Sequence, residues 1–182
     1  VAASLPRDAF KPAAIGRYRE TVVNELGYFS GLFPEVGGFG VMDASGNLLY
    51  ASGIALEFPG LADRGYFSAP AAQSGSALYF SEVIADKQSG RSFLFVIYPV
   101  RDAQGGMLGQ VVAPLDLDVL AKTFETVSMG SKGVVAIWRA DDGRLVLQLP
   151  AVAERVNGVL ANNPLHRRIE SGEKQGSMRL PV

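Results

Sequence analysis

The residues best suited to chemistry lie at positions 63–67, where the sequence reads Asp-Arg-Gly-Tyr-Phe. The guanidinium of Arg64 can bind a carboxylate through two parallel hydrogen bonds, and the rings of Tyr66 and Phe67 can enclose the rest of a small molecule. Asp63 is a suitable N-cap and predicts a short helix that carries these side chains. A structural interpretation stays open, in which Arg64 pairs with Asp63 or a nearby loop and the rings belong to the core.

A second group of polar and aromatic residues follows this helix. Tyr79, Ser81 and Asp86 lie on the next strand and turn, and Phe93 and Phe95 share one face of a later strand because alternate side chains point the same way. An apolar face with a few polar groups is typical of small-ligand sites. The other face of that strand carries Leu94, Val96 and Tyr98, and the sequence does not decide which face lines the site. The candidate ligand-binding residues are Arg64, Tyr66, Phe67, Tyr79, Ser81, Asp86, Phe93 and Phe95.

The sequence gives less support for a catalytic site or a metal site than for a ligand-binding site. The chain has one histidine, His166, and no cysteine, so we expect no metal site, no catalytic residue and no cofactor. No nucleophile-elbow pattern is present, and the glycine pairs lack the Lys-Ser/Thr of a phosphate loop. A small hydrolase that uses Asp63, Asp86 or Asp116 as acid and base is the enzymatic alternative.

Composition narrows the class of protein further. Of 182 residues 48% are hydrophobic, which predicts a globular chain with a substantial core. The 17 basic and 18 acidic residues give a net charge of −1, so we expect no nucleic-acid partner. No apolar run approaches the ~20 residues that span a bilayer. The chain begins Val-Ala-Ala-Ser rather than with methionine, and no signal peptide is visible.

The elements that position the site begin with one helix over residues 6–33, with Asp8 as N-cap and Pro12 near its first turn. Its apolar stripe consists of Ile15, Tyr18, Val22, Leu26, Phe29 and Phe33. The stripe predicts packing against a sheet, or a dimer seam, or both along one long helix.

Strands are predicted at residues 39–42, 48–52, 78–84, 92–100 and 107–113, with a helix at 63–73 between the second and third. Pro114 is expected to end the last strand because it cannot donate to the ladder. Asp116 then caps a helix that continues to about Phe124.

A further hairpin is predicted from residues 134–140 and 144–149, followed by a short helix at 164–170 and a strand near Met178. The stretch 138–146 echoes the strand-turn-strand pattern of 41–49, which suggests a second module of the same design. The remaining length is too short for a full copy. The second module is therefore either reduced or cut before its final strands.

These motifs together resemble the extracytoplasmic double Cache sensor domain (PAS-like, PhoQ-DcuS-CitA type) of bacterial transmembrane receptors. The resemblance covers roughly residues 39–150 and rests on the stretch 63–67, Ser81-Glu82, Gly90, the Pro-Val-Arg-Asp-x-x-Gly pattern at 99–105, and Gly109. It implies an α+β (mixed α/β) fold: a long N-terminal helix at 1–36, a membrane-distal PAS-like ligand-binding module at 37–128, and a smaller, incomplete membrane-proximal module at 129–182.

The resemblance also bears on the ligand. Amino-acid-sensing members have an arginine, an aromatic residue and an acid where Arg64, Tyr66 and Asp86 stand here. The departures are Pro59, Ile84 and Pro114, which replace a tyrosine, an aromatic residue and a second acid. Because that second acid would hold an α-ammonium group, the departures favour a carboxylate or another small anion as the ligand.

The resulting hypothesis is a periplasmic, non-enzymatic sensing domain of an inner-membrane receptor, with flanking transmembrane helices outside this sequence. Its output domain would be a histidine kinase, a diguanylate cyclase or a chemotaxis signaller, and its N-terminal helix would form the seam of a homodimer. Ligand binding would shift the helix or the seam by differential affinity. The alternatives are a ligand-free structural or dimerisation module, in which aromatic side chains fill the site, and a cytosolic PAS-like domain.

Overall fold

The computed structural model describes residues 5–53, 67, 78–86, 89–127, 130, 133–159, 167–168 and 171–176. The chain forms two compact units, Val1–Lys122 and Thr123–Val182. No helix in the described ranges is both long and apolar enough to cross a bilayer.

The N-terminal helix is shorter than predicted. Two 3-10 turns, η1 (Arg7–Phe10) and η2 (Pro12–Ala14), precede α1 (Ile15–Leu32). Lys11 between them is extended, with φ −103° and ψ 130°, because the ring of Pro12 disfavours helical geometry in the preceding residue. The prediction of one helix from residue 6 was therefore wrong, and Asp8 lies inside η1 instead of capping α1.

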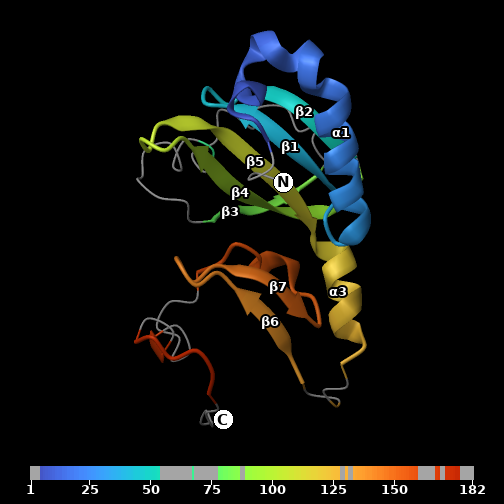
Figure 1. Ribbon diagram of the computed structural model, residues 1–182. Coiled ribbons are helices and arrows are strands. Elements are labelled where there is room, and N and C mark those ends of the chain that lie inside the picture. The colour runs from blue at the N-terminus through green and yellow to red at the C-terminus, as the bar shows by residue number, and fades with distance from the viewer. Residues whose placement is uncertain are drawn as a thin grey trace. The chain divides into compact units, whose positions relative to one another are not determined.

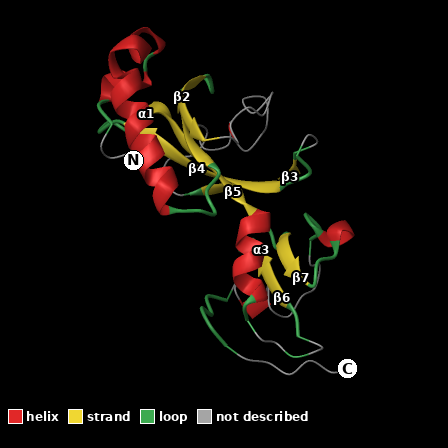
Figure 2. Cartoon of the chain, turned by 90° about the vertical axis from the view of Figure 1, so that its right-hand side faces the viewer, coloured by secondary structure: helices red, strands yellow, loops and turns green. Residues whose placement is uncertain are grey.

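Helix α1 lies against the sheet (Figure 2), and its apolar stripe contributes to the core there. Val22 and Leu26 are buried, and Ile15 and Tyr18 are partly buried against the same cluster. The sheet contributes Val41, Leu49, Tyr50 and Val111 to this cluster. At the helix end Phe33 is exposed, so the stripe serves as core along only part of its length.

The first unit contains an antiparallel five-stranded sheet in the order β2-β1-β5-β4-β3 (Figure 1). Its strands are β1 (Gly38–Asp43), β2 (Leu48–Gly53), β3 (Tyr79–Ala85), β4 (Ser92–Arg101) and β5 (Met107–Asp116). The two long strands β4 and β5 lie side by side near its centre. This arrangement of a helix on an antiparallel sheet, followed by a second, smaller sheet, confirms the predicted α+β class.

Pro114 does not end β5 as predicted. The strand continues to Asp116, and Pro114 pairs with Phe95 of β4. The carbonyl of Pro114 accepts a hydrogen bond from Gly37 on the other side of the strand, so the missing N–H also faces that side. The ladder with β1 stops at the Gly40–Val112 pair before it reaches the proline. Beyond the proline, a single bridge joins Val36 and Leu115 on the same side.

The helix α3 (Leu117–Glu125) follows β5 directly, and Asp116 caps it as predicted. In the second unit, β6 (Val135–Trp138) and β7 (Leu145–Leu149) form the predicted hairpin, and the 3-10 turn η3 (Ala153–Arg155) follows. Of the helix predicted at 63–73 only Phe67 is described, and it is helical. Most of the helix predicted at 164–170 and the strand near Met178 lie outside the described residues.

Candidate ligand-binding site

One face of the five-stranded sheet carries a buried cluster that is separate from the cluster beneath α1. Its buried members are Met42, Phe67, Phe93, Phe95, Ile97 and Val112, and Ala51, Tyr79 and Ile84 pack against them. We call this surface the Phe67 face. Val41 and Val111 belong to the α1 cluster, whereas their neighbours Met42 and Val112 belong to this one, as strand alternation requires.

The structure decides which side of β4 belongs to the candidate site. Phe93, Phe95 and Ile97 point to the Phe67 face, and the rings of Phe67 and Phe95 lie 6.4 Å apart at an interplanar angle of 59°. Phe67 itself is helical and 2% exposed. Tyr79 pairs with Ile97 across β3 and β4. Four of the predicted residues therefore come together, although their role in binding stays a prediction.

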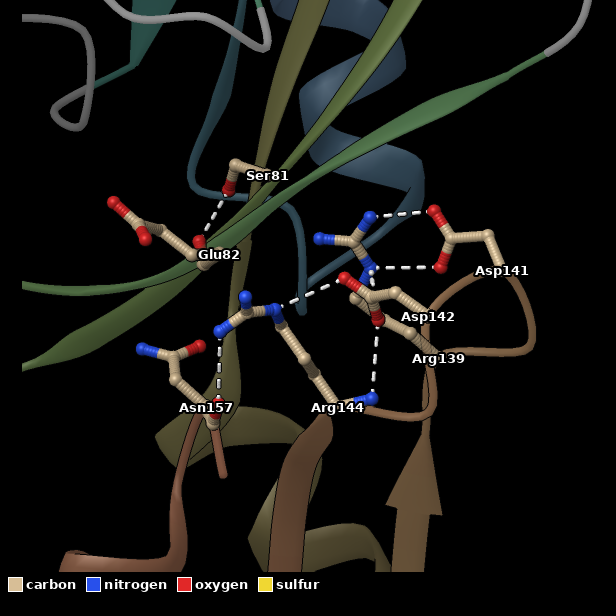
Figure 3. Close-up of polar contacts among 7 residues, drawn as sticks. All are labelled: Ser81, Glu82, Arg139, Asp141, Asp142, Arg144 and Asn157. Atoms are coloured by element: carbon tan, nitrogen blue, oxygen red, sulfur yellow. Dashed lines mark hydrogen bonds and ion pairs between the residues drawn. The ribbon is translucent and has the colours of Figure 1, made fainter. Parts of the chain in front are cut away.

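Ser81 is fully buried and serves the sheet. Its hydroxyl accepts a hydrogen bond from the Phe95 amide at 2.9 Å. The same hydroxyl donates to the Glu82 carbonyl (Figure 3). The β3–β4 register shifts between Phe80 and Val83 at this point. The Ser81 side chain thus takes the place of a strand carbonyl at a β-bulge, and positions Phe95 rather than facing outward.

Asp86 shapes the turn between β3 and β4. Its carboxylate accepts hydrogen bonds from the amide of Ser89, at 3.0 Å, and from the Ser89 hydroxyl. Its own amide donates to the Arg91 carbonyl at 2.8 Å. Arg64 and Tyr66, the remaining predicted site residues, lie outside the described residues.

Sequence reasoning missed a polar residue on this face, Gln110. Its Nε2 donates to the Phe67 carbonyl at 2.7 Å, and the residue is 2% exposed. The sequence did indicate that Gln110 has a polar partner, because a glutamine inside the apolar run of residues 107–113 is unfavourable to bury unless it forms hydrogen bonds. Its partner, by contrast, lies far away in the sequence.

A second missed feature joins β4, β5 and α3. Arg91 forms an ion pair with Asp116, which is 1% exposed. The guanidinium carbon of Arg91 lies 5.5 Å from the centre of the Phe93 ring. The other oxygen of Asp116 accepts from the amides of Asp118 and Val119. One buried carboxylate therefore connects the edge of the Phe67 face to the start of α3.

The second unit has a polar cluster at the β6–β7 turn (Figure 3). Arg139 binds Asp141 through two nitrogens, and this hydrogen bonding lowers the pKa of the Asp141 carboxyl below its ordinary value, despite partial desolvation. Arg144 binds Asp142 and the carbonyl of Asn157, each at 3.0 Å. The contacts with Asp141 and Asp142 close the turn, and the contact with Asn157 joins it to the segment after η3. Nowhere in the described ranges do three or more His, Cys, Asp or Glu residues gather as a metal site would require.

No family model and no curated protein matches this chain. Solved structures do. The extracellular domain of rpHK1S-Z16, assigned as a histidine kinase, has a TM-score of 0.66 and 22% identity over 89% of this chain and 71% of that chain. The sensor domain of the V. cholerae histidine kinase DctB has a TM-score of 0.54 and 18% identity over 92% of this chain and 62% of that one.

The ligand-binding domain of the Pseudomonas fluorescens chemoreceptor CtaA, in complex with L-serine, has a TM-score of 0.51 and 20% identity over 84% of this chain. This chain spans 64% of the CtaA chain and 62% of the DctB chain, less than two thirds of either. The fold is therefore that of extracellular sensor domains of signalling receptors. This confirms the fold that the double Cache resemblance predicted.

Proposed function

We propose that this chain is the extracytoplasmic small-molecule sensing domain of a transmembrane receptor, and that the ligand binds at the Phe67 face. The observation that carries the proposal is a buried aromatic cluster on one face of the sheet, with the buried amide of Gln110 among its apolar side chains. The sensor-domain fold supports the same class, because the similar structures are sensor domains and not catalytic domains. A shared fold by itself does not establish that this chain binds a ligand.

The proposed ligand is a small carboxylate anchored by Arg64. CtaA binds L-serine and L-leucine in its solved complexes, but here Pro114 stands where an acid would hold an α-ammonium group. Asp116 is the nearest buried acid along β5, and it already pairs with Arg91 and caps α3. Asp116 is therefore engaged elsewhere, which favours a carboxylate ligand without an ammonium group.

The organisation proposed around this site has three parts. Residues 1–36 provide the helical connection, 37–128 the ligand-binding module, and 129–182 the second module. A homodimer seam along α1 is supported by Tyr28 and Leu32, which are 66% and 52% exposed and lie one helical turn apart. The output domain would be a histidine kinase, a diguanylate cyclase or a chemotaxis signaller outside this sequence.

A second candidate function is a ligand-free structural module. It is favoured by the close packing of Phe67 on Phe95, since side chains that fill the face themselves leave less need for a ligand. The two functions differ in what Arg64 does. In the sensor it binds the ligand, whereas in the structural module it only contributes to folding.

A thermal-shift screen of small carboxylates, amino acids, amines and sugars separates the two, using wild type, Arg64→Ala and the control Arg19→Ala. Arg19 is an exposed residue of α1. A ligand at a hundred times its dissociation constant adds about 2.7 kcal/mol to stability, a readily visible shift. We expect carboxylates to shift wild type and Arg19→Ala but not Arg64→Ala. If no compound shifts the melting temperature and Arg64→Ala is only less stable than wild type, the ligand-free structural module is the function supported.

A further inference from the structure

The side chain of Gln110 has one amide group with two different environments. Gln110 lies in the middle of β5, paired with Met42 of β1 and Pro99 of β4. Met42 belongs to the Phe67 face, and directly paired residues of neighbouring strands point to the same side of a sheet. The amide is therefore held at the Phe67 face, and the residue is 2% exposed.

The contact with Phe67 determines the orientation of this amide. The Phe67 carbonyl can only accept a hydrogen bond, so the atom 2.7 Å from it must be the amide nitrogen, Nε2. The oxygen, Oε1, consequently points away from that carbonyl. It is buried and has no hydrogen-bond partner within the part of the chain that the structure describes.

A buried acceptor without a partner destabilises a protein, because the oxygen loses its hydrogen bonds to water on folding and gains none in return. An ordered water would need two or more polar partners to relieve it. The paired Met42 and the nearby Val112 on the same face are apolar and provide none. A donor supplied by a bound molecule would satisfy Oε1.

We infer that Gln110 Oε1 accepts a hydrogen bond from the ligand, and that the ligand is a small hydroxylated carboxylate. This inference rests on the proposed sensing function and narrows its ligand class. A hydroxyl donor fits better than an ammonium group, because the neutral amide of Gln110 brings no negative charge and Asp116 already has partners. Gln110 is then a specificity-determining residue that selects for a ligand with a hydrogen-bond donor.

Matched acids test this directly. Malate and succinate differ by one hydroxyl, as do lactate and propionate. Isothermal titration of the wild-type chain with each pair yields a ratio of affinities. We expect the hydroxylated acid of at least one pair to bind about tenfold to a hundredfold more tightly, because its deoxy analogue leaves a buried acceptor unsatisfied.

Variants of Gln110 test whether this residue causes the difference in affinity between the hydroxylated acid and its deoxy analogue. Gln110→Met has similar length and no acceptor, so we expect it to bring the ratio close to one while it still binds the deoxy acid. Gln110→Asn keeps an amide but is too short to reach both partners, and it provides the test if the Met variant does not fold. Leu108→Ala, on the same strand but packed against the α1 cluster, is the control and should keep the wild-type ratio.

The possible results separate failure of the Gln110 inference from failure of the proposed sensing function. If both acids of each pair bind equally, or if the preference survives in the Gln110 variants, the inference about Gln110 is wrong and the sensing function stands. If no acid of any kind binds the wild-type chain, the proposed carboxylate-sensing function fails, and the inference fails with it. A merely structural Gln110 would change stability in the variants without changing the ratio.

Discussion

Replacement of Asp116 tests how the end of β5 is joined to α3. The two carboxylate oxygens have separate tasks. Oδ1 accepts hydrogen bonds from the amides of Asp118 and Val119 at 3.0 and 3.2 Å, and Oδ2 forms the ion pair with Arg91. The side chain of Asp116 is 1% exposed and that of Arg91 is 41% exposed.

The contributions can be estimated one by one. An N-cap is worth about 1 kcal/mol. The ion pair lies between the exposed and fully buried cases because half-exposed Arg91 is partly screened by solvent, so its loss should cost about 1–3 kcal/mol. Asp116→Asn keeps a good capping oxygen and loses only the charge. Asp116→Ala loses both, and should cost about 1 kcal/mol more than Asp116→Asn.

Urea unfolding followed by far-UV circular dichroism measures these differences, with Asp118→Asn as the control. Asp118 is exposed in the first turn of α3. Its replacement by asparagine should lower the free energy of unfolding by no more than about 0.5 kcal/mol. Trp138 is the chain's single tryptophan and lies in β6, so its fluorescence separately follows the second unit. If Asp116→Asn is as stable as the control, the argument for the ion pair is refuted. Equal stability of the Asn and Ala variants would refute the argument for the cap.

Two further predictions concern the core of the first unit. Gly109→Ala should cost about 3 kcal/mol in urea unfolding, since an added Cβ would stand 2.1 Å from the Met42 carbonyl oxygen and 2.6 Å from the Phe10 ring. Gly16→Ala has open space around it and should instead stabilise α1 by about 0.5–1 kcal/mol; equal effects of both substitutions would contradict this reasoning. Burial raises the pKa of Tyr50 above its ordinary 10.0, so the folded chain holds this proton more tightly than the unfolded chain, and stability should fall as the pH rises above about 10. Tyr50→Phe should lessen that fall and, because the hydroxyl is buried without a partner in the described ranges, add about 1 kcal/mol at pH 7; an identical pH profile in wild type and variant would contradict the prediction.

Local chemistry accounts for the features that the sequence predicted correctly. The turn at residues 43–47 is closed by the Asp43 carboxylate, which accepts from the amides of Ser45 and Asn47, and such contacts need only neighbouring residues. The cap at Asp116 is local for the same reason. The start of α1 was misplaced although its signal was also local, because Pro12 restricts Lys11.

The candidate site was predicted only in part for a physical reason. Alternation along β4 separates Phe93 and Phe95 from Leu94, but it cannot say which set meets Phe67, because both sets are apolar. That choice depends on which layer packs on each face of the sheet. The sequence predicted a binding role for Ser81, whereas its hydrogen bond at the β3–β4 bulge depends on the register with β4.

The sequence by itself determined which segments of the chain form strands, their turns, the helix that follows β5, and the class of fold. Each of these depends on residues close together in the chain or on a regular apolar period. Only the tertiary structure decided that the Gln110 amide meets the Phe67 carbonyl, 43 residues away in the sequence, and that Arg91 meets Asp116. Such contacts form when packed layers bring distant backbone and side chains together, and no local pattern encodes that meeting.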